Sequence, residues 1–291
     1  MTRSTRPRLG RARKSLGQHF LVSDRAATRI AEALGDVAGR TVVEIGPGRG
    51  ILTAALLRRG ARVVGLELDE ALVDYLRARF ADQALEVLHQ DALELDLTAL
   101  ACERRLEPPL HVAGNIPYGI TSPLLRRLLA RPGELARAAL MLQREVAERL
   151  LAEPGTPAYG SLTVGVRAAA EVTHVLTLSP ARFRPPPKVW SSVVRIDPRP
   201  DAPEADRLAA LEELTKTLFS ARRKQLQKTL RQAGIASEAE LPALERALGE
   251  PLTNRPEELP VEKFLVLLDL LRRETGARGE FSTRAKDRVT S

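Results

Sequence analysis

Apolar and polar positions alternate along the first half of the chain in blocks that predict strands followed by helices. Short apolar runs bounded by turn residues indicate buried strands, and apolar residues spaced three or four apart indicate helices. We expect strands at 41–45, 62–66, 85–89, 110–114 and 138–142. We expect helices at 23–34, 50–59, 70–80, 122–130 and 144–152. Such alternation predicts an α/β fold with a doubly wound, parallel sheet covered by helices on both faces.

The pattern changes after Pro154. Two further strands are expected at 171–178 and 192–196, with a stiff, proline-rich loop at 183–188 between them. Trp190, just after this loop, is expected in the core. A proline-bounded linker at 198–203 precedes helical patterns near 205–219, 222–233, 237–248 and 261–272. These patterns predict a flexible basic N-terminus at 1–15, an α/β domain at 16–200, a helical domain at 201–275 and a flexible tail at 276–291.

Composition narrows the class of protein. A chain of 291 residues with 44% hydrophobic residues can form a full core. Its one cysteine, Cys102, and four scattered histidines provide neither a disulfide nor a zinc site, so we expect no metal. No apolar run is long enough for a membrane span, and a reducing cytoplasm fits best.

Positive charge is clustered as well as abundant. The net charge is +8, and the ranges 1–23 and 216–231 each contain six Lys or Arg residues and no acid. Acid-free basic blocks are typical of phosphate-binding surfaces, although a solvated face in an arginine-rich protein is the alternative. The charge therefore favours nucleic acid as a partner, with Arg222, Arg223, Lys224 and Lys228 as candidate contacts.

A glycine-rich turn follows the first strand of the alternating region. Gly46, Gly48 and Gly50 allow a sharp turn and a close approach of the backbone to a ligand. An ordinary α/β turn and a nicotinamide-nucleotide site are the alternatives. Glu67, 21 residues after Gly46, ends the next strand, where a carboxylate can bind ribose hydroxyls. Asp91 ends the third strand and could accept from an adenine amine.

The sequence Asn115-Ile-Pro-Tyr118 is the second candidate site, and it too follows a buried strand. An Asn oxygen can accept hydrogen bonds from an exocyclic amine, Pro117 fixes the turn, and the Tyr118 ring can stack on a planar base. Because carboxyl ends of parallel strands meet at one edge, this turn and the glycine turn should form one site. Together they predict transfer of a methyl group to adenine N6.

Nine segments in order resemble the ribosomal RNA adenine dimethyltransferase family, and most closely its small-subunit branch. The resemblance covers roughly residues 14–272. The matching segments are Gly17-Gln-His-Phe-Leu21, Glu44-Ile-Gly-Pro-Gly48, Glu67-Leu-Asp69, Gln90-Asp-Ala92, Asn115-Ile-Pro-Tyr118, 141–149, Tyr159-Gly160, 183–189 and 219–226.

The resemblance implies a class I, Rossmann-like methyltransferase sheet that binds S-adenosyl-L-methionine. It implies that His19 and Leu21 lie against the cofactor, and that Gly46 contacts its amino-acid end. It assigns the ribose to Glu67, the adenine amine to Asp91, and a place between methyl group and base to Asn115. Tyr118 and Phe183 would sandwich the target adenine.

The implied reaction is N6,N6-dimethylation of two adjacent adenosines near the 3′ end of 16S ribosomal RNA. The implied partner is an assembling 30S particle, and the protein is expected to be a monomer. A large-subunit methyltransferase of the antibiotic-resistance type is one alternative, since Ile116 also occurs in that branch. A non-catalytic assembly factor on the same fold is the other. His19 departs from the family pattern, in which Asn is usual.

Overall fold

The computed structural model describes residues 18–131 and 133–276, which form two compact units. The sheet unit contains residues 18–151 and 169–204, and the helical unit contains 152–168 and 205–276. The helical unit therefore includes 152–168, a stretch that the sequence pattern had placed in the first domain. The ends predicted to be flexible, 1–15 and 276–291, lie outside the described residues apart from Gly276.

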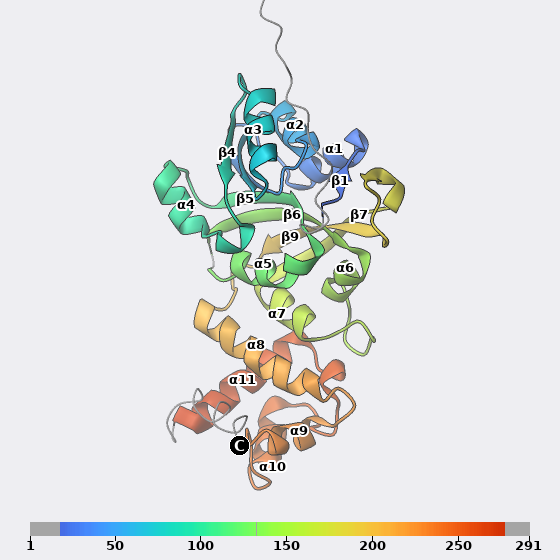
Figure 1. Ribbon diagram of the computed structural model, residues 1–291. Coiled ribbons are helices and arrows are strands. Elements are labelled where there is room, and N and C mark those ends of the chain that lie inside the picture. The colour runs from blue at the N-terminus through green and yellow to red at the C-terminus, as the bar shows by residue number, and fades with distance from the viewer. Residues whose placement is uncertain (1–17, 132, 277–291) are drawn as a thin grey trace, which may run out of the picture. The chain divides into compact units, whose positions relative to one another are not determined.

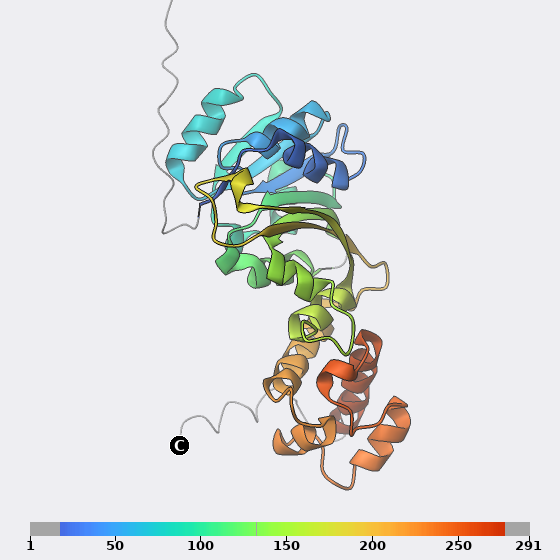
Figure 2. The same cartoon turned by 90° about the vertical axis from the view of Figure 1, so that its right-hand side faces the viewer.

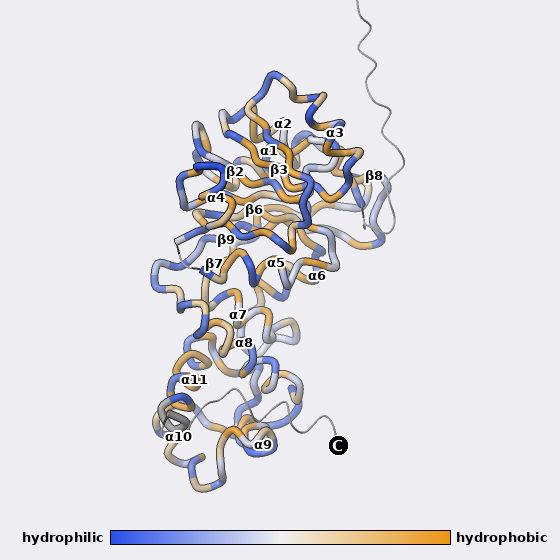
Figure 3. Tube along the Cα trace, turned by 60° about the vertical axis from the view of Figure 1, so that its left-hand side comes forward, coloured by the Kyte–Doolittle hydropathy of each residue, from blue (hydrophilic) through white to orange (hydrophobic). Residues whose placement is uncertain are grey.

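Seven strands form the main sheet, in the order β4-β3-β2-β5-β6-β9-β7. The first five strands of that order are parallel, as predicted: β4 (Leu85–His89), β3 (Arg62–Glu67), β2 (Thr41–Ile45), β5 (Leu110–Asn115) and β6 (Leu135–Gln143). These strands are rich in valine, isoleucine and leucine. In Figure 3 they are among the hydrophobic segments that cross the middle of this unit. The structure thus confirms the predicted α/β sheet.

The last two strands pair differently from the rest. β9 (Ser191–Pro198) is antiparallel to both β6 and β7 (Ala170–Leu178). The N-terminal end of β9 therefore lies at the same edge of the sheet as the carboxyl ends of the parallel strands. A separate two-stranded sheet joins β1 (Phe20–Leu21) to β8 (Phe183–Arg184).

Six helices flank this sheet, with α1, α2 and α3 on one face and α4, α5 and α6 on the other (Figures 1 and 2). They are α1 (Asp24–Ala33), α2 (Ile51–Arg58), α3 (Glu70–Arg79), α4 (Leu97–Arg104), α5 (Thr121–Leu128) and α6 (Arg144–Leu150). Ser23 begins α1 by accepting a hydrogen bond from the Ala26 N–H. Ala27, Ile30 and Ala31 then recur on one face and are fully buried.

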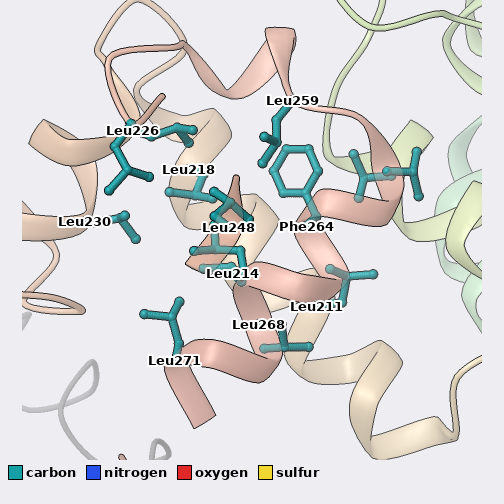
Figure 4. Packing of buried hydrophobic residues seen from close by; sticks show 14 of the residues in the cluster. Leu211, Leu214, Leu218, Leu226, Leu230, Leu248, Leu259, Phe264, Leu268 and Leu271 are labelled. Atoms are coloured by element: carbon teal, nitrogen blue, oxygen red, sulfur yellow. The ribbon is translucent and has the colours of Figure 1, made fainter. Parts of the chain in front are cut away.

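The helical unit has its own core. Its helices are α7 (Ser161–Ala169, whose last residue belongs to the sheet unit), α8 (Ala205–Ser220), α9 (Leu226–Gln232), α10 (Leu241–Leu248) and α11 (Val261–Gly276). Figure 4 shows Leu214, Leu218 and Phe264 among the leucine side chains that fill it. Tyr159, from the 152–168 stretch, is fully buried there and donates to the Leu259 carbonyl at 2.9 Å.

Four turns of 3-10 helix complete the described chain: η2 (Ala92–Glu94), η3 (Tyr118–Ile120), η4 (Pro180–Arg182) and η5 (Pro256–Glu258). The helix predicted from residue 222 begins only at Leu226, because residues 221–224 form a turn closed by the Lys224 N–H and the Ala221 carbonyl. Among the helices described here, none has the length and apolarity that a bilayer span requires.

Candidate active site

One cavity opens at the carboxyl ends of β2, β3 and β5. The chain runs outward from β2 to β4 and then returns to β5, so the strand order reverses between β2 and β5. Open α/β sheets bind ligands at such a switch point. The cavity is lined by Gln18, His19, Phe20, Ile45, Gly46, Gly48, Leu66, Glu67, Leu68, Leu72, Gln90, Asp91, Ala92, Asn115, Ile116, Pro117, Tyr118 and Ile120.

The glycine turn forms one wall of the cavity. Gly46, Gly48 and Gly50 have φ angles of +62°, +57° and +75°, which disfavour other residue types. A Cβ on Gly50 would lie 2.5 Å from the Phe80 ring, and one on Gly48 would lie 3.0 Å from Phe20. The turn is therefore restricted to glycine by both backbone conformation and packing, and bare backbone faces the ligand space at Gly46 and Gly48.

Glu67 ends β3 beside this turn and is only 6% exposed. Its carboxylate oxygens accept hydrogen bonds at 3.0 Å from the N–H groups of Gly48 and Asp69. Burial raises the pKa of Glu67 above its ordinary value, while these N–H groups oppose that rise. Each carboxylate oxygen retains a further acceptor position, so the side chain can bind two neighbouring hydroxyl groups.

Glu44 is a buried acid for which the sequence had indicated no role. It lies within β2, is 1% exposed, and accepts a hydrogen bond from the Thr53 hydroxyl at 2.6 Å. Burial raises the pKa of Glu44 to about 8, and the nearby Glu67 charge adds to the effect. The one available signal was an acid in an otherwise apolar strand.

Asp91 lies at the third strand end, as predicted from the pattern. The Oδ1 atom of Asp91 accepts a hydrogen bond from the Leu93 N–H at 2.8 Å and so caps the start of η2. Oδ2 is therefore the oxygen left for a ligand. Leu68 also lines the cavity, with an exposed fraction of 47%. An apolar side chain beside two carboxylates suits a flat ring that carries polar edges. Sequence reasoning missed Leu68 because single exposed leucines are common.

The Asn115–Tyr118 turn forms the opposite wall. Gly114 precedes it, and a Cβ there would lie 2.7 Å from the Ile45 carbonyl oxygen, so only glycine lets β5 approach β2 so closely. Asn115 donates from Nδ2 to the His19 carbonyl at 2.8 Å. The Ile116 N–H donates to the Met141 carbonyl at 3.0 Å. With its nitrogen committed, the Asn115 amide has its oxygen available as an acceptor.

Tyr118 follows in η3 and lines the same cavity. Its hydroxyl lies 3.3 Å from the Ser191 hydroxyl. The rings of Tyr118 and His19 are stacked, with centroids 6.1 Å apart and an angle of 27° between planes. The His19 ring nitrogen Nδ1 lies 2.8 Å from the Pro185 carbonyl oxygen, which holds the imidazole in place. His19 therefore supports the Tyr118 ring as well as lining the cavity.

Two predicted site residues are absent from the lining of this cavity. Leu21 and Phe183 are paired between β1 and β8, are 7% and 1% exposed, and belong to the core beneath α1 and α2. Neither lines this cavity, but Leu21 lines a smaller adjoining pocket together with Gly46, Gly48 and Asn115. The alternation of side chains along β1 explains this, because neighbouring residues point to opposite sides. With Phe183 buried, the predicted sandwich reduces to the single ring of Tyr118.

Comparison with known proteins agrees with this geometry. Residues 10–270 match the family model described as ribosomal RNA adenine dimethylase. The chain belongs to this family. It is 39% identical over 263 residues to the ribosomal RNA small subunit methyltransferase A of Idiomarina loihiensis, covering 90% of this chain and 88% of the relative.

Two solved structures of similar fold extend the comparison. A dimethyladenosine transferase from Plasmodium falciparum superposes with a TM-score of 0.71 at 27% identity, covering 88% of this chain and 98% of that protein. The 23S rRNA methyltransferase ErmE superposes with a TM-score of 0.65 at 27% identity, covering 87% and 99%. This adenine dimethylase family member therefore has a class I methyltransferase fold.

The predicted phosphate contacts lie in the helical unit, and the structure divides them. Arg222 pairs with Glu257 at 2.9 Å and also donates to the Pro157 carbonyl, while Lys224 donates to the Gln232 side chain at 2.7 Å. Arg223 and Lys228 are exposed, and neither side chain has an ion pair or hydrogen bond within the described residues. These two are the better candidates for phosphate.

The donor atoms of the site suit an organic cofactor rather than a metal. The cavity contains two carboxylates, glycine backbone and apolar side chains. No group of three or more His, Cys, Asp or Glu residues suited to a metal ion occurs in residues 18–131 or 133–276.

Proposed function

We propose that this protein uses S-adenosyl-L-methionine to dimethylate N6 of two adjacent adenosines near the 3′ end of 16S ribosomal RNA. Its substrate is the small subunit during assembly in the cytoplasm, and it acts as a monomer. The observation that carries the proposal is a single cavity with two walls. The glycine turn, Glu67 and Asp91 form one wall, and the Asn115–Tyr118 turn forms the other.

The first wall suits an adenosyl cofactor. Glu67 offers acceptors for two ribose hydroxyls, and Asp91 Oδ2 offers one for the adenine amine. Leu68 offers an apolar surface to the adenine ring, and the bare backbone at Gly46 admits the amino-acid end. When bound, this cofactor supplies a methyl group already activated by the positive sulfur.

The second wall suits the adenine that receives the methyl group. Its N6 is a poor nucleophile because the nitrogen lone pair is delocalised into the ring. The Asn115 oxygen and the Ile116 carbonyl can accept from N6, which favours a pyramidal amine and stabilises the positive charge that develops on it. Tyr118 orients the ring by stacking, and this positioning supplies much of the rate. The proton can leave after transfer, so no side chain is assigned as a general base.

Three features support dimethylation of the small subunit over the alternatives. A pocket that reads the ring by stacking accepts an amine that already carries one methyl group, which permits a second transfer. The curated relative in Idiomarina is named for the small subunit, at higher identity than the 27% shared with ErmE. The intact Asn115–Tyr118 turn argues against a catalytically idle assembly factor.

Labelled cofactor tests the proposal directly. The protein is incubated with undermethylated small subunits, with large subunits and with protein-free 16S RNA, and the modified nucleotides are mapped by mass spectrometry. We expect two methyl groups on each of two neighbouring adenosines, and a poorer yield on protein-free RNA because phosphate contacts select a folded shape. The variant Asn115→Ala is the control for contaminating enzymes. A single modified adenosine in large-subunit RNA would establish the resistance-type alternative.

A further inference from the structure

The single tryptophan of the chain lies on the surface next to the catalytic turn. Trp190 has an exposed fraction of 49%, and the preceding Val189 has 43%. Sequence reasoning had favoured a core position for this ring, and the structure contradicts that expectation. Tryptophan is enriched at interaction surfaces, because its ring contributes a large apolar contact area.

The backbone of Trp190 is held beside the site by two connections. Its carbonyl accepts from the Arg144 N–H at 2.9 Å, where α6 begins. Ser191, the next residue, lies 3.3 Å by its hydroxyl from that of Tyr118. Trp190 is therefore the immediate neighbour in sequence of Ser191, the residue whose hydroxyl contacts Tyr118. Consecutive Cα atoms are about 3.8 Å apart.

Strand register places the Trp190 backbone at the edge of the sheet where the cavity opens. Ser191 pairs with Gln143, the last residue of β6, and Asn115 pairs with Met141 on the same strand. Because β9 is antiparallel, its start lies at the edge where the parallel strands end. Trp190 does not line the cavity itself. Its backbone lies at the same edge of the sheet as the Asn115–Tyr118 turn.

The surrounding charge suits a nucleic-acid strand. The segment 180–190 contains Arg182, Arg184 and Lys188, all exposed, and no acid. The nearest acids of α6, Glu145 and Glu148, pair with Arg149 and Arg144 respectively. Cations beside an exposed aromatic ring are the combination that binds single-stranded nucleic acid, by phosphate contact and by base stacking.

We propose that Trp190 stacks on the base of the nucleotide next to the target adenosine, outside the cavity. A base that enters a pocket leaves its neighbour without a stacking partner, and the cost of unstacking opposes binding. A protein ring that covers the vacated face offsets this cost. The inference rests on the proposed function, because it takes the occupant of the cavity to be an adenine in RNA.

Intrinsic fluorescence tests the contact, since Trp190 is the only tryptophan of the chain. The full-length protein is titrated with the 3′-terminal segment of 16S RNA, and binding is followed separately by gel shift. We expect emission to fall about twofold or more at saturation, with protection from iodide quenching. Trp190→Phe is the blank. Unchanged emission when the gel shift shows bound RNA would overturn the inference. Emission that changes with protein concentration and not with RNA would also overturn it, because it would indicate that Trp190 contacts a second copy of the protein.

Kinetics on undermethylated small subunits test the consequence. Trp190→Ala should raise KM for the subunits about tenfold, as expected when one base stack is removed, with cofactor affinity unchanged. Trp190→Phe should restore most of the loss, and Val189→Ala should resemble the wild type. A wild-type KM for Trp190→Ala, in an assay where the wild type methylates, would overturn this inference alone. Absence of methylation by the wild type would instead overturn the proposed function, and fluorescence would still decide the contact.

Discussion

The cavity of the sheet unit and the basic segment of the helical unit, residues 216–231, were both predicted from the sequence as binding surfaces. They differ in whether their charged side chains already have partners within the protein. At the cavity, the carboxylate of Glu67 is held by backbone N–H groups with acceptor positions to spare. In the basic segment, Arg222 already pairs with an acid from η5. Position at a strand end therefore predicts which side chains line the cavity, whereas density of charge does not predict which cations pair with acids.

The largest effect should come from the Asn115–Tyr118 turn. Asn115→Ala removes the acceptor for N6 and should slow methyl transfer about 10²-fold or more, because that hydrogen bond strengthens as charge develops. Cofactor affinity, measured by calorimetry, should remain close to that of the wild type. Single-turnover rates near normal would show that Asn115 only secures the His19 carbonyl.

Glu67→Ala should weaken cofactor binding by about 1.5–3 kcal/mol, because two hydroxyls lose a charged acceptor. Calorimetry with S-adenosyl-L-methionine measures it. Glu70→Ala is the matched control, since Glu70 is an exposed acid three residues further on. Unchanged affinity in a folded Glu67→Ala protein would remove Glu67 from the site, and tight binding of a nicotinamide dinucleotide would overturn the assignment of the cavity.

The basic segment contains Arg222, which pairs with an acid, and Arg223 and Lys228, which form no ion pair within the described residues. Reversing Arg223 and Lys228 to Glu should lower the slope of log affinity against log salt by about 0.7–0.9 for each phosphate that the protein no longer neutralises. Arg222→Ala should leave the slope unchanged, because that guanidinium is committed to Glu257. RNA binding measured over a salt series decides between them. Equal slopes for all variants would make the whole segment a solvated face.

The last prediction concerns the stability of the fold and the buried acid Glu44. Its raised pKa of about 8 means that the folded state holds a proton that the unfolded state releases near pH 4.5. The associated stability is fully present below pH 4.5 and is lost as the pH rises to about 8. Glu44→Gln should therefore flatten the dependence of Tm on pH and raise Tm above about pH 8. A variant that follows the wild-type curve would show that Glu44 is charged in the fold.

The parallel strands and the positions of Glu67, Asp91 and Asn115 could be predicted because apolar runs define strands and their ends meet at one edge. The burial of Leu21 and Phe183 could not, since two-residue strands have no usable periodicity and their pairing is distant in sequence. The helix α7 was missed because Gly165 and its β-branched neighbours are poor helix formers.

Ion pairs between residues far apart in the sequence also cannot be predicted from a short stretch of it. An acid-free window around Arg222 says nothing of Glu257, which approaches it only in the folded helical unit. The placement of residues 152–168 in the first domain differs from the structure for the same reason. The apolar partners of the stretch 152–168 lie between residues 205 and 271, beyond three intervening strands of the sheet unit.

That division of the helical core has a consequence for the order of synthesis. The stretch that carries Tyr159 and Val164 leaves the ribosome roughly a hundred residues before the last of its partners, Leu271. At about 5–20 residues per second, its apolar side chains remain incompletely covered for on the order of 5–20 s. During that interval β7 and β9 can complete the sheet. The sheet unit of the nascent protein can therefore fold before the final helix of the helical unit has been synthesised.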